Sequence, residues 1–296
     1  MGEVSVLVDG LTHTEGCRWR DGRIWFSDIY TYSVRSAEED GSDLRTEAEV
    51  PGEPSGLGWL PDGRLLVVSM KDRRLVRREH DGRVVTHADL SAHTALPLND
   101  MVVGADGTAW VGSFGFDIMS LAPRRPGRLL RVTPDGSVSA AGEGLHFPNG
   151  ATIIDGRTLV LAESFGNRLS AFDIRPDGSL SERRDWARFG PVPEAEDPVE
   201  AMGELAVAAD GISTVDAEGA IWVADFVRSR AVRVRPGGEI VDEVSTGDLS
   251  CYSCVLGGAD GRTLFLCATP AEFDPEIRAN NPESAVLSVR VEVPAA

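Results

Sequence analysis

The stretch LGWLPDGRLLVVS, residues 57–69, places the pair Asp62-Gly63 between two apolar runs. An Asp-Gly pair flanked by apolar runs is typical of a β-hairpin, because these residues tolerate the backbone angles of a tight turn. Five further segments repeat this pattern of apolar strand, acidic-Gly turn and second apolar strand. They are CRWRDGRIWFSD (17–28), MVVGADGTAWVGS (101–113), ATIIDGRTLVLAES (151–164), STVDAEGAIWVAD (213–225) and VLGGADGRTLFLCA (255–268).

The six repeats recur at intervals of 41, 44, 49, 63 and 42 residues, measured between their turn glycines Gly22, Gly63, Gly107, Gly156, Gly219 and Gly261. A weaker hairpin pattern lies between successive repeats, as in LVRREHDGRVV at residues 75–85. Two hairpins per repeat give four short antiparallel strands, which form one blade of a β-propeller. The sequence therefore predicts an all-β, six-bladed propeller with four antiparallel strands per blade.

A propeller closes its ring so that no blade exposes an unpaired edge. After the sixth repeat only one good strand remains, at residues 285–293, and the missing strand is available at residues 4–8. We expect this N-terminal strand to join the last blade as its outer edge, so that residues 1–296 form a single domain. A seven-bladed or two-domain arrangement is the less favoured alternative.

The longest interval contains residues 185–204, which are rich in Pro and Glu and lack the alternation of a strand. We expect an insertion loop over one face of the propeller, in which Phe189 and Met202 are candidates for a lid.

Composition limits the partners of this chain. The 296 residues carry a formal net charge of −18 with a pI near 4.7, which disfavours nucleic acid and anionic membranes as partners. The N-terminus lacks the pattern of a signal peptide, and no apolar run is long enough for a membrane helix. The sequence predicts a cytoplasmic protein. Its four cysteines are too few and too unevenly spaced for a disulfide framework, and are interpreted as packing thiols.

The same phase of each repeat carries polar residues where an inner strand would begin with apolar ones. The pairs at this phase are Glu15-Gly16, Ser55-Gly56, Asn99-Asp100, Asn149-Gly150, Asp210-Gly211 and Ser253-Cys254. Carboxylates brought together at the propeller axis repel one another unless a cation lies between them. Oxygen donors suit one divalent metal ion, Ca²⁺ first, with Mg²⁺, Mn²⁺ or Zn²⁺ as alternatives. The alternative interpretation is that these side chains only cap strands at the channel mouth.

The chain resembles the gluconolactonase, regucalcin and senescence-marker family of six-bladed, metal-dependent lactonases over nearly its whole length. The resemblance is carried by EGCRW (15–19) with IWFSD (24–28), LND (98–100), VGSFGFD (111–117), FPNG (147–150), ADGI (209–212) and VDAEGAIWVAD (215–225).

This resemblance implies that Glu15, Asn149 and Asp210 bind the metal and that Asp210 is the general base. It also implies that Asn99 contacts the substrate, and sometimes a metal-bound water. The implied activity is hydrolysis of a lactone, a cyclic ester, to a hydroxy acid. Serine hydrolysis is disfavoured, because no G-x-S-x-G motif is present. Of the five histidines, His13 and His146 lie just before Glu15 and Asn149. Each is interpreted as a residue that packs a loop, and a role as a proton shuttle is the alternative.

One departure bears on the substrate. Sugar-lactone members typically carry an arginine two residues before the residue that corresponds to Asn99, whereas this chain has Pro97, which donates no hydrogen bond. Aromatic residues follow the second strands of the repeats, and we expect them to form an apolar, substrate-binding rim. They are Phe114, Phe116, Phe165 and Phe226, with Met119 and Tyr252 nearby.

The sequence leaves three rival functions open on the same scaffold. A phosphotriesterase would use the same oxygen ligands, and an isomerase or lyase would fit the apolar rim. A non-catalytic, calcium-binding propeller would present a broad apolar patch, whereas an enzyme would have one concave pocket over the metal. A small-molecule substrate is the expected partner, and the oligomeric state is left undetermined.

Overall fold

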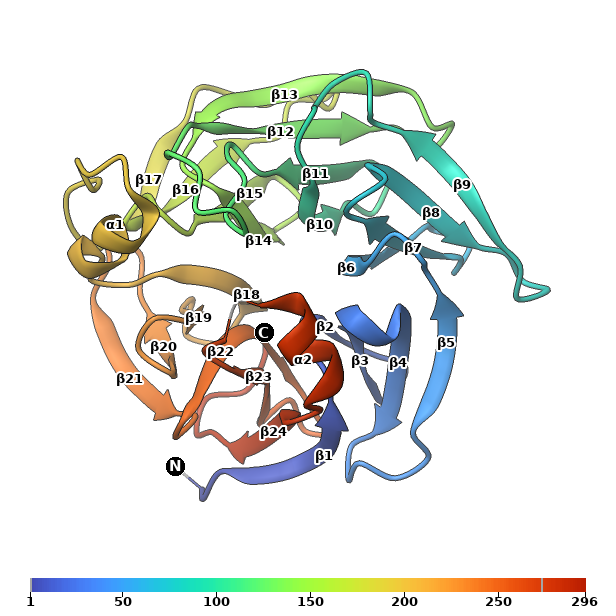
Figure 1. The fold of residues 1–296 in the computed structure, drawn as a ribbon, viewed down its shortest axis with the longest axis vertical. Coiled ribbons are helices and arrows are strands. Elements are labelled where there is room, and N and C mark those ends of the chain that lie inside the picture. Colours follow the sequence, from blue (N-terminus) through green and yellow to red (C-terminus); the bar gives the residue numbers. More distant parts are fainter. Residues whose placement is uncertain (1, 273) are drawn as a thin grey trace.

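The computed structural model describes residues 2–272 and 274–296, and in it six four-stranded antiparallel sheets surround a central axis (Figure 1). From inner to outer strand, the first three blades are β2 (Thr14–Arg20), β3 (Arg23–Asp28), β4 (Ser33–Glu38) and β5 (Arg45–Glu49); β6 (Pro54–Trp59), β7 (Leu65–Ser69), β8 (Arg74–Arg78) and β9 (Val84–Asp89); and β10 (Leu98–Val103), β11 (Ala109–Ser113), β12 (Gly127–Val132) and β13 (Val138–Leu145).

The remaining three blades complete the ring. They are β14 (Pro148–Ile154), β15 (Thr158–Glu163), β16 (Arg168–Asp173) and β17 (Arg184–Arg188); β18 (Ala209–Val215), β19 (Ile221–Asp225), β20 (Arg230–Val234) and β21 (Ile240–Ser245); and β22 (Leu249–Gly257), β23 (Thr263–Pro270), β24 (Ser284–Arg290) and β1 (Ser5–Leu11). Short helical segments lie between strands, namely η1 (Ile29–Thr31), α1 (Pro198–Glu204) and α2 (Pro275–Asn280).

The six-bladed prediction is confirmed, including the closure of the ring. Strand β1 pairs antiparallel with β24, so the N-terminal strand is the outer edge of the last blade. All six predicted turn glycines have positive φ, between 64° and 87°. Asn149 and Gly150 instead belong to β14, so this Asn-Gly pair is not a turn.

Apolar side chains fill the space between neighbouring blades. One cluster joins blades 2 and 3 through Leu66, Val68 and Val111, and similar clusters join each other pair of neighbours. This follows from the alternation of the strands, because each sheet turns one apolar face to each neighbour. All four cysteines are buried and free, as the packing interpretation requires.

The expected loop over residues 185–204 needs correction. Its first residues lie in β17, where Ala187 is buried, and its last residues form α1. The helix begins at an Asp197 N-cap whose carboxylate accepts from the amides of Val199 and Glu200, followed by Pro198 at the first helical turn. These local capping signals outweigh the loop-like composition of the segment.

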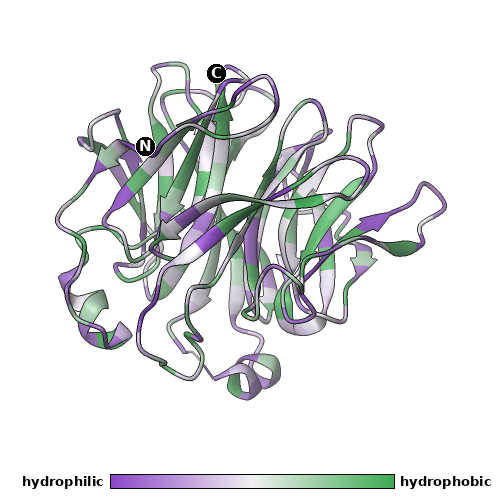
Figure 2. Cartoon of the chain, turned by 90° about the horizontal axis from the view of Figure 1, so that it is seen from above, coloured by the Kyte–Doolittle hydropathy of each residue, from purple (hydrophilic) through white to green (hydrophobic). Residues whose placement is uncertain are grey.

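The two faces of the propeller differ (Figure 2). Both α-helices lie on one face, whereas the C-terminus lies on the other, where Ala296 donates its amide to the carbonyl of Val215 at the far end of β18. Among the described residues, no helix is long and apolar enough to cross a membrane.

Candidate functional site

The inner strands share one irregularity at the phase singled out from the sequence. In β10, for example, Leu98 pairs with Ser113 and Met101 with Val111, so Asn99 and Asp100 together oppose one residue. The same one-residue bulge occurs at this phase in β6, β14 and β18, and one residue later in β2, directly after Glu15. A β-bulge changes the direction in which a side chain points. Five blades therefore present a polar side chain at one level of the propeller.

Glycines beside these polar residues allow the inner strands to approach closely. A Cβ atom added to Gly150 would lie 2.6 Å from the Cα of Gly211 on the next blade, and one added to Gly16 would lie 2.6 Å from the carbonyl oxygen of Ser55. No side chain fits at such distances. The glycine that follows each candidate ligand therefore sets the diameter of the ring.

Glu15, Asn149 and Asp210 are buried and line the same cavity. Asn149 donates from Nδ2 to Oγ of Ser164 at 3.1 Å, which orients its amide. Among the described residues, no donor reaches the buried Oδ1 of Asn149 or Oδ1 of Asp210. Buried oxygens without a donor are costly. A cation held by these oxygens would remove that cost.

Electrostatics indicate the same need for a cation. Burial raises the pKa of Glu15 well above its ordinary value, and the Asp210 and Asp100 carboxylates raise it further. Burial and Asp100 likewise raise the pKa of Asp210 well above its ordinary value. A divalent ion would reverse both shifts, because it favours the ionised carboxylates. Within the described residues, no three His, Cys, Asp or Glu side chains could hold a metal ion, so such a site depends on the amide oxygen of Asn149.

Asp100 of blade 3 has a partner on blade 1. Its Oδ1 accepts from Nη2 of Arg18 at 2.6 Å, and Arg18 also donates to the carbonyl oxygens of Cys17, Leu57 and Met101. Asn99, by contrast, donates from Nδ2 to the carbonyl of Pro148 at 3.1 Å and lines the cavity. The two halves of the Asn99-Asp100 pair therefore face different surroundings.

The cavity over these residues has a volume of about 500 Å³ and two unlike walls. One wall is apolar and includes Phe114, Phe147, Phe165, Phe226, Met119 and Met202. The other is polar and includes His13, Tyr30, Glu53, Lys71 and Tyr252. Pro97 also lines the cavity, at the position where the resemblance places an arginine.

The predicted aromatic rim is only partly on this cavity. Phe114, Phe165 and Phe226 line it, whereas Phe116 lies behind Phe147, at a ring distance of 5.4 Å, and faces a second, smaller cavity. Phe147 stacks on Phe114 with ring centroids 4.5 Å apart. Phe147 takes the role that the sequence interpretation gave to Phe116, and its signal was its place directly before the Pro-Asn-Gly stretch.

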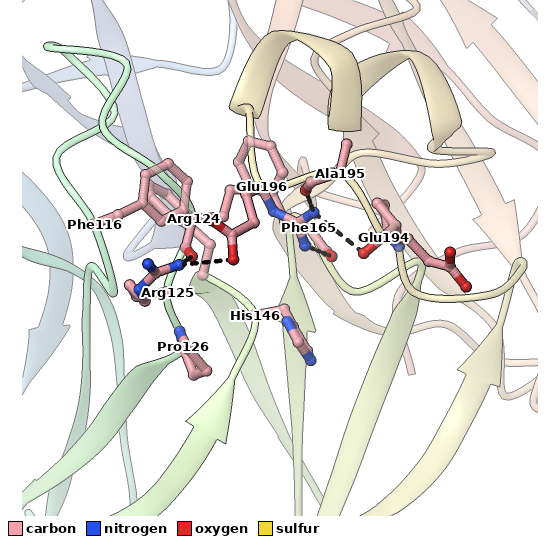
Figure 3. A pocket seen from close by; sticks show the side chains of 11 residues that line it. Phe116, Arg124, Arg125, Pro126, His146, Phe165, Glu194, Ala195 and Glu196 are labelled. Atoms are coloured by element: carbon pink, nitrogen blue, oxygen red, sulfur yellow. Dashed lines mark hydrogen bonds and ion pairs between the residues drawn. The ribbon is translucent and has the colours of Figure 1, made fainter.

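The smaller cavity, of about 130 Å³, shows how the insertion is held (Figure 3). Arg124 donates from Nη1 to the carbonyls of Pro193 and Ala195, at 3.2 and 2.6 Å, and its guanidinium lies 5.3 Å from the ring of Phe165. This clamp fixes the segment before α1, and α1 in turn brings Met202 to the main cavity. Phe189, the other lid candidate, packs instead against the apolar layer between blades 4 and 5.

The two histidines of interest occupy different cavities. His13 lines the main cavity, where burial and the charge of Arg278 lower its pKa to about 3, so its imidazole is neutral. His146 lines the smaller cavity, and its amide donates to Oε2 of Glu163 at 2.7 Å. His146 is thus separated from the candidate metal ligands.

Sequence reasoning missed two charged groups beside the cavity. Lys71 is the single lysine of the chain, and its Nζ lies 2.5 Å from Oε1 of the buried Glu53. Its rarity was the only signal in the sequence. Arg278 of α2 is buried and its charge acts on the pKa of Tyr252, and nothing in its local sequence distinguishes it from the surface arginines.

Comparison with known proteins gives matches over most of the chain. Residues 13–269 match the model of the SMP-30/Gluconolactonase/LRE-like region. A regucalcin from Danio rerio is 28% identical over 63% of this chain, and the match spans 59% of that protein's length. An L-arabinolactonase from Azospirillum brasilense is 25% identical over 97% of this chain and 91% of its own. The structure of a calcium-binding protein, regucalcin, from Agrobacterium tumefaciens superposes with a TM-score of 0.77 and 19% identity, covering 100% of this chain and 96% of that one.

Proposed function

This chain belongs to the SMP-30/Gluconolactonase/LRE-like family, and we propose that it is a metal-dependent hydrolase that opens a lactone to a hydroxy acid. The observation that carries this proposal is the set of buried oxygens on residues that line the main cavity. Oδ1 of Asn149 and Oδ1 of Asp210 have no donor among the described residues, and Glu15 lies beside them. The lactonase name of the Azospirillum brasilense relative supports the choice of reaction.

Glu15, Asn149 and Asp210 would hold one divalent cation, which the donor chemistry suits, because two carboxylates and one amide supply only oxygen. Calcium is the ion we favour, in keeping with the name of the calcium-binding regucalcin structure. When bound, such a cation polarises an ester carbonyl and stabilises negative charge on its oxygen. The closed surroundings of these residues strengthen both effects.

The chain's own residues supply the remaining functions. Asp210 accepts the proton of the water molecule whose oxygen bonds to the carbonyl carbon, and the ring C–O bond then breaks. Asn99 orients the substrate, since its side chain lines the cavity and its Nδ2 is held by the carbonyl of Pro148. Glu15 keeps its carboxylate at the ring, where the amide of Gly16 donates to its Oε2 at 2.6 Å.

The substrate we propose is less polar than a sugar lactone. Phe114, Phe147 and Phe165 form an aromatic wall over the candidate metal ligands, and Pro97 offers no hydrogen bond to a hydroxyl. A substrate with many hydroxyl groups would lose hydrogen bonds to water against this wall. A lactone with an alkyl or aryl body would gain contact instead.

Metal content tests the site before any substrate is needed. Purified protein is loaded with Ca²⁺, Mg²⁺, Mn²⁺ or Zn²⁺, dialysed and analysed by mass spectrometry of the metals, together with Glu15→Gln and Asp210→Asn. We expect about one ion per chain in the wild type and strong loss in both variants. Glu272→Gln removes a carboxylate from the rim of the same cavity and should keep the ion. Unchanged metal content in all variants would overturn the site.

Hydrolysis tests the reaction separately. The loaded protein is assayed on sugar, aliphatic and aryl lactones, with and without a chelator. We expect ring opening that is lost with the chelator and that is faster for aliphatic or aryl lactones than for sugar lactones. Absence of hydrolysis on the whole panel, with metal bound, would refute the lactonase proposal and leave the metal site standing.

A further inference from the structure

The sixth blade contributes a different group to the cavity from the other five. Its inner strand β22 has a bulge between Cys251 and Ser253, and the residue within it is Tyr252. The side chain of Tyr252 lines the same cavity as Glu15 and Asp210. The sixth blade therefore presents a phenol to the cavity that the candidate metal ligands line.

We propose that Tyr252 is a catalytic residue that gives a proton to the oxygen released when the lactone ring opens, and that Arg278 is the positioning residue behind it. This inference rests on the proposed lactonase function and adds a general acid to it. Nothing in the sequence marks Tyr252 beyond its place near the channel mouth.

The ring of Tyr252 is held from both sides. It stacks on Phe226 with centroids 5.8 Å apart and an interplanar angle of 13°, and its centroid lies 4.8 Å from that of His13. Only 7% of the residue is exposed. These two contacts hold the ring of Tyr252 in the wall of the cavity.

Tyr252 carries its proton over the whole physiological range. Burial raises its pKa well above the ordinary value of a phenol, an effect that the Arg278 charge opposes and the Asp210 and Glu15 carboxylates reinforce. A phenol in this state donates a hydrogen bond but does not ionise by itself. It transfers its proton only to a strong base, and the alkoxide of an opening alkyl lactone is such a base.

Arg278 provides charge where a phenolate would form. It lies on α2, is 2% exposed, and donates from Nε to the carbonyl of Glu272 at 2.6 Å. Within the described part of the chain, no carboxylate forms an ion pair with it. A buried cation without such a partner is costly, and the phenolate that Tyr252 forms during the transfer would offset that cost.

A second tyrosine near Arg278 is less suited to the role. Tyr30 lies on η1, outside the inner strands, and lines the same cavity. Its pKa is raised to about 12, first by burial and then by Glu53, and neither Glu15 nor Asp210 contributes notably. Tyr30 thus lies outside the inner strands that carry the candidate metal ligands, and it serves as the matched control.

The proposed step balances without another reactant. The water oxygen bonds to the carbonyl carbon, and one water proton passes to Asp210. The ring C–O bond then breaks, its electron pair stays on the leaving oxygen, and that oxygen takes the proton of Tyr252. Solvent returns the proton from Asp210 to the Tyr252 phenolate, so the net change is lactone plus water to hydroxy acid.

Two six-membered lactones with different leaving oxygens test the role. δ-Valerolactone releases an alkoxide, which needs a proton, whereas dihydrocoumarin releases a phenolate, which needs one far less. Tyr252→Phe keeps the ring and removes the hydroxyl. We expect kcat/KM to fall about 100-fold for δ-valerolactone and less than about fivefold for dihydrocoumarin. Equal losses on both lactones would overturn the acid role.

The controls separate this inference from the proposed function. The quantity compared is kcat/KM for δ-valerolactone divided by kcat/KM for dihydrocoumarin. Tyr30→Phe should keep the wild-type value of this ratio, and a fall as large as in Tyr252→Phe would overturn the assignment to Tyr252. Arg278→Met should lower that ratio about tenfold, and Arg278→Lys should restore part of it. If circular dichroism shows that Arg278→Met is unfolded, the tyrosine variants still test the acid role of Tyr252. A wild-type protein that opens neither lactone contradicts the proposed function itself.

Discussion

Nη2 of Arg18 and Oδ1 of Asp100 lie 2.6 Å apart, although the two residues belong to blades 1 and 3 and their strands are not neighbours in the ring. The ion pair therefore spans the inner strand of blade 2, where the carbonyl of Leu57 accepts from Nε of Arg18. It also places a carboxylate whose charge acts on the pKa of both Glu15 and Asp210. This one ion pair therefore affects both the stability of the fold and the charge of the candidate metal site.

Removing the cation of this pair should destabilise the fold. Arg18→Met leaves Asp100, which is 1% exposed, without its partner, so we expect the free energy of unfolding to fall by about 3 kcal/mol in urea. Asp100→Asn in the same chain should recover part of the loss. Arg20→Met removes a cation from the exposed pair with Asp21 and should cost below about 1 kcal/mol. Similar losses for both arginines would contradict the role of the pair.

The metal-free protein should lose stability as the pH rises. Because folding raises the pKa of Glu15 and Asp210, the folded protein keeps protons that the unfolded chain releases. Their stabilising contribution is complete below the ordinary carboxyl range, near pH 4, and declines as the pH rises through the raised pKa values. In chelator-treated protein, Asp210→Asn should thus gain thermal stability over the wild type with rising pH. A constant difference in Tm would contradict this.

Asn149 and Asn99, the two asparagines near the propeller axis, should differ in their effect on metal binding. Asn149→Ala removes a buried amide oxygen, so we expect metal affinity measured by calorimetry to fall tenfold or more, at least as much as for loss of an outer-shell partner. Asn99→Ala should leave metal affinity within about twofold and raise KM for the best lactone. The assignment fails if the two variants lose metal equally.

The close approach of the inner strands should make one glycine irreplaceable. In Gly150→Ala, the new Cβ would lie 2.6 Å from Cα of Gly211 and 2.7 Å from the amide nitrogen of Ile212, so backbone must move. We expect a loss of about 3 kcal/mol or more in the free energy of unfolding. Gly203→Ala lies in α1 with open space around its Cβ, and should be neutral or slightly stabilising. Urea denaturation of the two variants compares them directly.

Closure of the ring by β1 gives a further prediction. Leu11 is fully buried in the layer between blades 6 and 1, so Leu11→Ala should cost about 2–5 kcal/mol. Val6 on the same strand is 62% exposed, and Val6→Ala should cost less than about 0.5 kcal/mol. Chemical denaturation measures both. Equal small effects would show that the N-terminal strand contributes little to closure.

Much of the fold and part of the site could be predicted because a propeller repeats. The Asp62-Gly63 hairpin and its five relatives are local features, set by turn chemistry and by alternation along each strand. Once the repeat is known, residues of equal phase must lie at one level of the ring. That symmetry is why Glu15, Asn149 and Asp210 could be placed at one level without coordinates, and why Asn149-Gly150 could be separated from a turn. Their selection from the residues of that level as the metal ligands rested on the family resemblance.

The segments that break the repeat could not be read in this way. The loop expected over residues 185–204 contains the end of blade 4 and a capped helix, because Ala187 packs in the core while Asp197 and Pro198 start α1. Phe147 lines the main cavity in place of the expected Phe116 for a similar reason. Which of two nearby aromatics faces a cavity depends on the loops packed behind it, and Arg124 fixes one of those loops.

The sequence by itself determined the blade number, the closure by the N-terminal strand and the level at which the candidate ligands lie, since each follows from local pattern and repetition. The tertiary structure alone decided the partners of the buried charges. Arg18 of blade 1 pairs with Asp100 of blade 3, and the charge of Arg278 acts on Tyr252, although no spacing in the chain relates either pair. Such contacts join residues far apart in sequence, and their distances are set by how the blades pack around the axis.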